Sequence, residues 1–244
     1  MTKGTHAKFG GKILGTIMAV FAHPDDETFI CGGAIAKYAA KGHHTILVCA
    51  TKGEMGRRMG VPPLATRETI ATVREQELKS ACEALGIAEV QLLGYRDKSL
   101  EIEPLGNLVQ KVLSSMQAAR PDVVITFHED FGGHPDHSTI GAAATRAFAT
   151  YKRDNADAKL YFIAWSNMLD RARDHGLAPE QFVTIDIREH QLEKMRAFRA
   201  HKTQTEMNDW LWGDDRSAMR GVGTEEYFIQ YDSPYRDGLT SLIG

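Results

Sequence analysis

The sequence predicts an α/β fold: a Rossmann-like three-layer sandwich with a mostly parallel sheet, formed as a single domain. Short apolar runs rich in aliphatic and β-branched residues alternate with longer segments of 3.6-residue period. The chain has 244 residues, a length that fits one domain. No internal repeat or low-complexity linker divides it. We therefore expect one domain over residues 1–244, with residues 1–11 as a flexible tail.

Strands are expected wherever a short aliphatic run stands alone. These runs are residues 13–21, 45–50, 90–93 and 123–127, with two weaker candidates at 159–165 and 181–187. The helical segments lie between them. Leu78, Ala81, Cys82 and Leu85 follow helical spacing, and Gly86 then ends the pattern. Residues 105–116 and 140–148 carry similar stripes. This alternation is typical of βαβ units, with helices on both faces of a parallel sheet.

The final third of the chain has weaker patterns. We expect a helix over residues 188–201. Residues 207–223 contain Trp210 and Trp212 among Gly, Asp and Arg, which predicts a loop or short helix near the mouth of a substrate site.

Composition narrows the function classes. The net charge is −3, and no dense stripe of Lys and Arg with interleaved aromatic residues occurs, so nucleic-acid binding is disfavoured. The three cysteines have unrelated spacings, which suggests a reducing compartment. The apolar run at 13–22 is too short for a membrane span, which needs about 18 residues. We interpret it as a buried strand and expect a cytoplasmic protein with no membrane span.

Two His-Pro-Asp tripeptides follow predicted strands. The first lies in Ala22-His23-Pro24-Asp25-Asp26-Glu27, ahead of a helix expected to begin near Thr28. The second lies in His134-Pro135-Asp136-His137. Taken alone, the first cluster could be a simple capping turn. Ligands of parallel sheets bind beyond the carboxyl ends of the strands, so both clusters are expected at one edge of the sheet.

Imidazoles and carboxylates from these two turns suit a catalytic metal. A catalytic zinc site usually has three protein ligands and leaves a fourth position for water, whose pKa it lowers from about 15.7 towards about 7. The two turns also provide a spare carboxylate for a general base and a spare histidine for a developing oxyanion. These spare groups favour catalysis over a closed structural site.

The two motifs resemble those of the LmbE-like, or PIG-L-type, N-acetylglucosamine deacetylases. Weaker similar features are Thr51-Lys52-Gly53-Glu54-Met55-Gly56, Arg74 with Glu77-Leu78, and His201-Lys202-Thr203-Gln204. The resemblance implies a zinc-dependent hydrolase that cleaves the amide of an N-acetylated amino sugar or sugar conjugate. It leaves Fe²⁺ as an alternative metal and a homo-oligomer as an option.

Carried over by residue, the resemblance implies three zinc ligands: His23, Asp26 and His137. Asp25 becomes the general base for the zinc-bound water. His134 is expected to stabilise the oxyanion or protonate the leaving amine, and Asp136 to orient an imidazole. Arg74 is assigned either to substrate contact or to a surface ion pair. Gly32 and Gly33 are expected to allow close packing beside the site.

One position departs from the family pattern. Members acting on thiol-precursor sugars often carry a tyrosine two residues before the first histidine of the second motif, and here that residue is Gly132. His128 is either a replacement for the missing hydroxyl or an ordinary strand-end histidine. A hydrolase of a non-sugar N-acyl substrate and a non-catalytic metal- or sugar-binding protein stay as alternatives. An Fe(II) oxygenase gives Asp25 no role, and a nucleotide-binding Rossmann domain would need a glycine-rich turn after its first strand.

Overall fold

The computed structural model describes residues 14–170, 174, 177, 181–231 and 240–243. The expected tail at residues 1–11 lies outside them. A seven-stranded sheet in the order β3-β2-β1-β4-β5-β7-β6 forms the centre of the molecule. The strands are β1 Thr16–Phe21, β2 His44–Thr51, β3 Glu89–Tyr95, β4 Val123–Thr126, β5 Lys159–Ala164, β6 Phe182–Asp186 and β7 Glu225–Gln230.

Five strands pair in parallel and two do not. β1 pairs with β2 and β4, β2 also pairs with β3, and β4 also pairs with β5, all in parallel. β7 runs antiparallel to both β5 and β6. The inner strand β1 is buried on both faces after its first residue, as expected for an apolar run inside a parallel sheet. This architecture confirms the predicted fold class.

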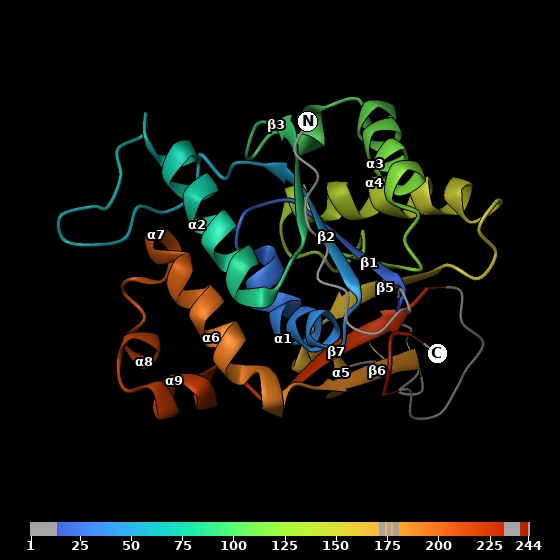
Figure 1. Cartoon of the computed structure of the whole chain (residues 1–244). Coiled ribbons are helices and arrows are strands. Elements are labelled where there is room, and N and C mark those ends of the chain that lie inside the picture. Colours follow the sequence, from blue (N-terminus) through green and yellow to red (C-terminus); the bar gives the residue numbers. More distant parts are fainter. Residues whose placement is uncertain (1–13, 171–173, 175–176, 178–180, 232–239, 244) are drawn as a thin grey trace, which may run out of the picture.

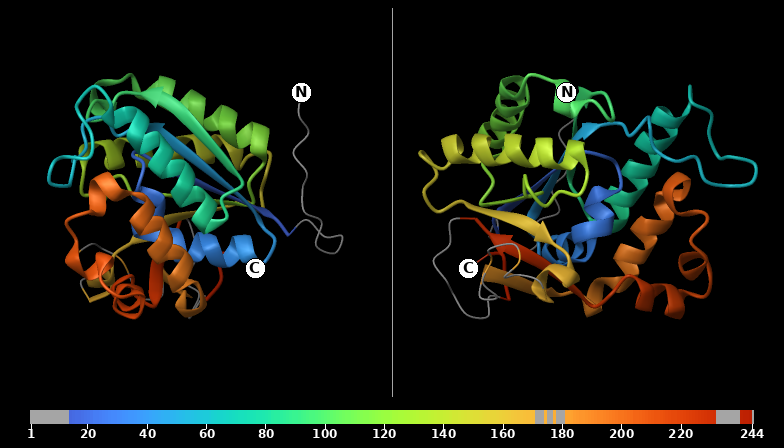
Figure 2. Two further views of the ribbon diagram at one scale, coloured as in Figure 1. Left: turned by 60° about the vertical axis from the view of Figure 1, so that its left-hand side comes forward. Right: turned by 180° about the vertical axis from the view of Figure 1, so that it is seen from behind.

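Helices cover both faces of the sheet. The longer ones are α1 Asp26–Ala40, α2 Ile70–Leu85, α3 Leu105–Ala119, α4 Pro135–Tyr151 and α6 Gln191–Ala200. The shorter elements are η1 Leu100–Ile102, α5 Ser166–Asp170, η4 Arg188–His190, α7 Lys202–Thr205, α8 Asp209–Trp212 and α9 Asp215–Gly221. α3 packs with α4 on one face, and α1 packs with α2 and α6 on the other (Figures 1 and 2).

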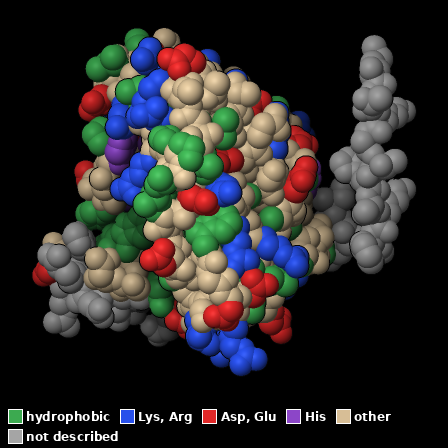
Figure 3. Space-filling view, turned by 90° about the vertical axis from the view of Figure 1, so that its left-hand side faces the viewer, with side chains coloured by type: hydrophobic (Ala, Val, Ile, Leu, Met, Phe, Trp, Pro, Cys, Tyr) green, Lys and Arg blue, Asp and Glu red, His purple; other side chains and the backbone are tan. Residues whose placement is uncertain are grey.

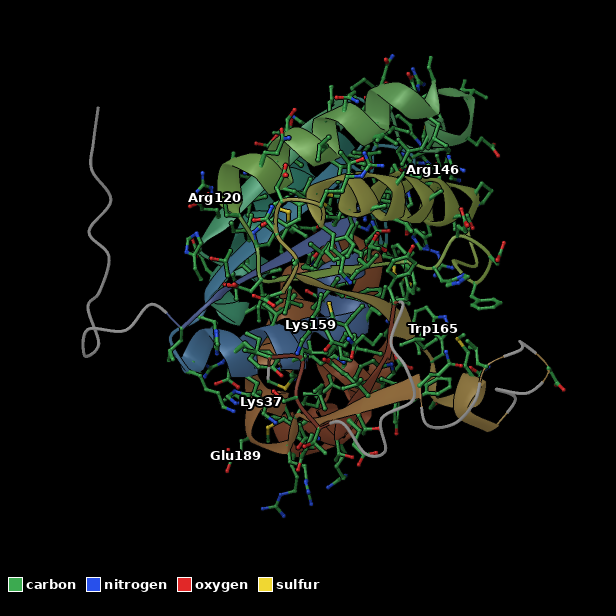
Figure 4. The ribbon with its side chains drawn as sticks, turned by 90° about the vertical axis from the view of Figure 1, so that its right-hand side faces the viewer. Lys37, Arg120, Arg146, Lys159, Trp165 and Glu189 are labelled. Carbon is green, nitrogen blue, oxygen red and sulfur yellow. The ribbon has the colours of Figure 1, made fainter. Side chains whose placement is uncertain are left out.

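The strand order places β1 and β4 side by side at the point where the direction of the connections reverses. The helices that follow these two neighbouring strands, α1 and α4, leave towards opposite faces of the sheet (Figure 1). The turns after the two strands therefore diverge at the carboxyl edge, where ligands of such sheets bind. Figure 4 labels Lys159, the first residue of β5, and Trp165, which directly follows the last residue of that strand.

Three sequence expectations need correction. α1 begins at Asp26 and not near Thr28, so Asp26 and Glu27 belong to its first turn. Strand β7 was not expected, because its buried Glu226 breaks an apolar pattern and is instead paired with Lys194 at 2.7 Å. The helix predicted over 188–201 is split into η4 and α6.

The tryptophan segment forms the short helices α8 and α9, which share a small apolar cluster with α6. Trp210 meets the Phe198 ring edge-on at 5.8 Å, and Trp212 donates a hydrogen bond from Nε1 to the Thr205 carbonyl at 2.7 Å. The expected position near a substrate mouth stays a prediction. Among the described ranges, no helix is long and apolar enough to cross a membrane. On the face in Figure 3, Lys and Arg side chains alternate with Asp and Glu.

Candidate metal centre and active site

The first turn links β1 to α1 through a residue in an unusual backbone conformation. Asp25, the N-cap of α1, has a φ of 113°. A non-glycine residue in such a region costs about 1–3 kcal/mol and is often found at functional sites. The next residue bends back: Asp26 Oδ2 accepts hydrogen bonds from the backbone amides of His23 at 2.8 Å and Ala22 at 3.2 Å. The turn therefore points two consecutive carboxylates at the sheet edge.

The second turn is the N-terminus of α4. His134 is the N-cap, and its Nδ1 accepts a hydrogen bond from the Asp136 amide at 3.1 Å. The ring of His137 stacks on Phe127 with centroids 3.9 Å apart. Its Nδ1 lies 2.9 Å from the Gly132 carbonyl, which fixes the proton on that nitrogen and leaves Nε2 free to bind a metal.

The two turns bring the three expected metal ligands together. His137 Nε2 lies 3.2 Å from His23 Nδ1 and 3.2 Å from Asp26 Oδ1. The ligand atoms of these three residues all lie within 4.8 Å of one another. Ligands about 2.0–2.1 Å from a tetrahedral zinc are separated by about 3.3 Å, so the spacing fits such an ion. This group could hold a metal ion.

Two further carboxylates support His23 from its other side. Its Nε2 lies 3.0 Å from Asp136 Oδ2 and 3.1 Å from Asp97 Oδ1. Burial lowers the pKa of His23, but the hydrogen bonds to Asp136 and Asp97 outweigh it and raise that pKa to about 10. The site therefore strongly favours a positive charge. Sequence reasoning missed Asp97; its position just after β3, at the same sheet edge, was the available signal.

An alternative ligand set contains His23, His134 and Asp136. Asp136 is less suited to a metal, because its two oxygens already accept backbone hydrogen bonds from Lys98 at 2.7 Å and Leu100 at 3.1 Å. It is also buried, with an exposed fraction of 1%. The structure therefore favours Asp136 as a support that orients His23.

Asp25 stands beside the ligands with one strong partner. Arg74 Nη2 donates to Asp25 Oδ2 at 2.9 Å and also to the Pro24 carbonyl, while its Nη1 donates to the Gly53 carbonyl at 2.8 Å. Burial raises the pKa of Asp25 to about 6, although Arg74 opposes the rise. The side chain of Arg74 is only 3% exposed, so the surface ion pair considered for it is not what the structure shows. Substrate contact by Arg74 stays a prediction.

His134 presents a neutral imidazole to the same space. Burial lowers its pKa, and the neighbouring His23 and His137 lower it further. Because Nδ1 accepts the Asp136 amide proton, the neutral ring carries its own proton on Nε2. The His134 and His23 rings meet edge-on with centroids 5.1 Å apart. His134 can therefore offer an N–H group close to the metal ligands.

The weaker sequence motifs contact one another around the loop after β2. Glu77 accepts two hydrogen bonds from Thr203, from the amide and the hydroxyl, each at 2.6 Å. Gln204 is bonded in both directions to the backbone of Arg57, at 2.8 and 3.1 Å. Together with Arg74 at Gly53, these contacts tie the loop after β2 to α2 and α7.

The absence of a side chain at Gly132 has a local structural reason. A Cβ atom there would lie 2.8 Å from the Ser138 amide nitrogen and 3.0 Å from the Cβ of His137, closer than real contacts allow.

His128 stacks on Phe131 with centroids 4.3 Å apart and meets Phe162 edge-on. These contacts are those of a strand-end histidine. Gly33 meets the expectation of close packing, since a Cβ there would lie 2.5 Å from Ile187.

Residues 18–148, more than half of the chain, match the family model described as PIG-L, GlcNAc-PI de-N-acetylase. This chain belongs to the PIG-L family. The match confirms the resemblance inferred from the two His-Pro-Asp motifs.

Relatives in the PIG-L family carry deacetylase names. A probable N-acetyl-α-D-glucosaminyl L-malate deacetylase 2 from Bacillus anthracis is 37% identical over 188 residues, covering 77% of this chain and 80% of the relative. A 1D-myo-inositol 2-acetamido-2-deoxy-α-D-glucopyranoside deacetylase from Actinosynnema mirum is 30% identical, covering 93% and 96%.

Solved structures share the fold. The N,N'-diacetylchitobiose deacetylase of Pyrococcus horikoshii gives a TM-score of 0.64 at 22% identity, covering 89% of this chain and 84% of that one. A 4-carboxy-2-hydroxymuconate hydratase from Pseudomonas putida gives 0.66 at 18% identity, covering 93% and 100%. The fold alone therefore does not decide the reaction.

Proposed function

We propose that this chain is a zinc-dependent N-deacetylase that cleaves the amide of an N-acetylglucosamine conjugate or a similar small N-acyl sugar. The observation that carries the proposal is the Asp25 carboxylate, which pairs with Arg74 and stands outside the group of His23, Asp26 and His137 that could hold the metal. A metal-binding protein without catalysis would have no use for this additional base. The deacetylase relatives, at 37% and 30% identity, support the reaction class.

The proposed metal ligands are His23 Nδ1, Asp26 Oδ1 and His137 Nε2. Two imidazoles and one carboxylate match the ligand set of catalytic zinc sites, and Fe²⁺ is the alternative metal. A bound zinc would lower the pKa of water to about 7 and polarise the acetyl carbonyl.

The chain's own residues would then move the protons. Asp25 accepts a proton from the attacking water while the water oxygen forms a bond to the acetyl carbon. The N–H of His134 at Nε2 donates a hydrogen bond to the developing oxyanion, a role that its neutral tautomer supports. The C–N bond then breaks, and the nitrogen takes up a proton to leave as the amine with acetate as the second product. Asp25 can supply that proton, because it holds the one taken from the water; His134 would supply it only from its protonated form.

Arg74 would act through Asp25. Its guanidinium joins Asp25 to the Pro24 and Gly53 carbonyls, which keeps the base in one orientation. A cytoplasmic location is part of the proposal, and it is supported by three buried cysteines that are all free, Cys31, Cys49 and Cys82.

An amine-release screen tests the proposal. Protein purified without chelator would be analysed for metals and then assayed, with zinc present, on N-acetylglucosamine, its malate and inositol conjugates, other glycosides and N-acetylated peptides. We expect about one zinc per chain and amine release from an N-acetylglucosamine conjugate, lost in Asp25→Ala. Absence of a transition metal, or no amine from any sugar in the zinc-loaded protein, would overturn it.

A further inference from the structure

We propose that Glu27 and His201 form a positioning pair that holds the main chain of Asp25 in its catalytic conformation. The inference rests on the proposed function, since it takes Asp25 as the base. Neither residue has a role in the metal centre or in the transfer of protons described above.

The pair reaches Asp25 through its amide. Glu27 Oε2 accepts the hydrogen bond of the Asp25 N–H at 3.0 Å. Asp25 has a φ of 113°, which residues other than glycine seldom adopt, so other groups must hold this conformation. The Glu27 carboxylate, two residues further along the chain, is one of these groups.

His201 in turn fixes Glu27. Its Nε2 lies 2.7 Å from Glu27 Oε1, and the side chains of both residues have an exposed fraction of 0%. Thr28 donates its hydroxyl to the same Oε1 at 2.7 Å. The other ring nitrogen of His201, Nδ1, is buried and has no hydrogen-bond partner among the described residues. Glu27 is therefore the group that this imidazole serves.

Stability alone does not account for such a pair. The free energy lost when two polar side chains are removed from water offsets much of the attraction between them. A buried pair is therefore weak evidence for a stabilising role. His201 lies at the junction of α6 and α7, 174 positions from Glu27 in the sequence. The neighbouring Thr203 is anchored to Glu77 of α2. Two elements distant in sequence thus hold one short turn in place.

The two restraints on Asp25 are complementary. Arg74 holds the Asp25 carboxylate, and the Glu27–His201 pair holds its amide. Asp26 is fixed separately by the amides of Ala22 and His23. Loss of His201 should therefore let Asp25 relax away from its position while the metal ligands stay in place. A base displaced by about 1 Å costs about a hundredfold in rate.

The test compares His201→Leu, which removes the hydrogen bond, with His201→Gln, whose amide can still donate to Glu27. We expect His201→Leu to lower kcat by about 10- to 100-fold with little change in KM, because only the base moves. The metal content should stay at the wild-type level, and His201→Gln should recover part of the activity. If His201→Leu does not fold, kcat, KM and metal content are instead compared between Glu27→Gln and His201→Gln.

A double-mutant cycle separates positioning from general damage. In an Asp25→Ala background, His201→Leu should cause no further loss, because the group on which it acts is already missing. The matched control is Glu226→Gln, another buried carboxylate, which lies on β7 and binds Lys194 and the amide of Gly33 in α1. It should keep activity within about twofold of wild type. The same fold-loss from His201→Leu in both backgrounds would overturn the proposal, as would unchanged kcat in the single variant.

Amide hydrogen exchange at Asp25 gives a readout that needs no substrate. The Asp25 N–H should exchange slowly in the wild-type chain and at least tenfold faster in His201→Leu. If the wild-type chain releases no amine from any substrate, the proposed function fails, and the exchange experiment still decides whether the pair holds Asp25. Equal exchange rates in the two proteins would overturn the positioning pair itself.

Discussion

The two turns that meet at the proposed metal centre are held in opposite ways. The first, between β1 and α1, is enclosed: Asp26 and Glu27 are buried, and partners reach the turn from α2 and from the α6–α7 junction. The second, at the start of α4, is more open and relies on close neighbours. Gly133 and Pro135 are exposed, and the rings of His134 and His137 are partly so.

This difference assigns different chemistry to the two turns. Burial of the first turn raises the pKa of Asp25 to about 6, a suitable value for a base near neutral pH. Burial in the second turn lowers the pKa of His134 and keeps it neutral. In the proposed mechanism the enclosed turn would provide two metal ligands and the base, while the open turn would provide the third ligand and an N–H group for the oxyanion.

The largest expected effect comes from the ligand on the open turn. His137→Ala should lose both bound metal and activity, because one imidazole and one carboxylate cannot form the site alone. Metal analysis after dialysis, with an assay of amine release, checks this. His128→Ala is the matched histidine from the same segment and should retain the metal. Full metal occupancy in His137→Ala would show that the ligand assignment is wrong.

Asp25→Ala, unlike His137→Ala, should leave the metal bound. Its effect on the rate should be almost as large. We expect metal to be retained and kcat to fall by about 10²- to 10⁴-fold, the usual contribution of a general base. Metal content and kcat measured on one preparation give the result. Turnover close to wild type would remove Asp25 as the base and leave the enclosed turn with a purely structural role.

Substitution of His134 by Asn tests the role of the open turn while the N-cap of α4 is kept. His134→Asn retains a good N-cap for α4 but removes the imidazole, so kcat should fall by about 10²-fold with stability unchanged. His134→Ala should lose the same activity and, in addition, about 1 kcal/mol of unfolding free energy. Activity assays and urea unfolding of both variants separate the two effects. Wild-type kcat in His134→Asn would exclude the oxyanion role.

The smallest expected effect is a shift in pH dependence. Asp25 must be ionised to act as a base, so kcat/KM should fall as the pH drops below about 6, or somewhat lower where a bound cation stabilises the carboxylate. Arg74 lowers the pKa of Asp25, so Arg74→Gln should move this acidic limb to higher pH. A pH profile of kcat/KM measures the shift. An acidic limb that stays in place would separate Arg74 from the base.

Much of this site was predictable because its motifs are local. The strand–helix alternation determines a parallel sheet, and the two His-Pro-Asp clusters fall after β1 and β4, which are neighbours in the sheet. Asp97 escaped notice because a lone aspartate after an edge strand has no motif around it. Strand β7 escaped because a buried glutamate interrupts its pattern.

The sequence by itself determined the fold class, the family and the residues that could bind a metal, since each depends on periodicity or on a short contiguous motif. Only the tertiary structure decided their partners. A surface ion pair was one expectation for Arg74, yet its side chain lies buried against Asp25, and His201 meets Glu27 across 174 positions. Such contacts depend on how α2 and α6 pack on α1. No local pattern encodes that packing.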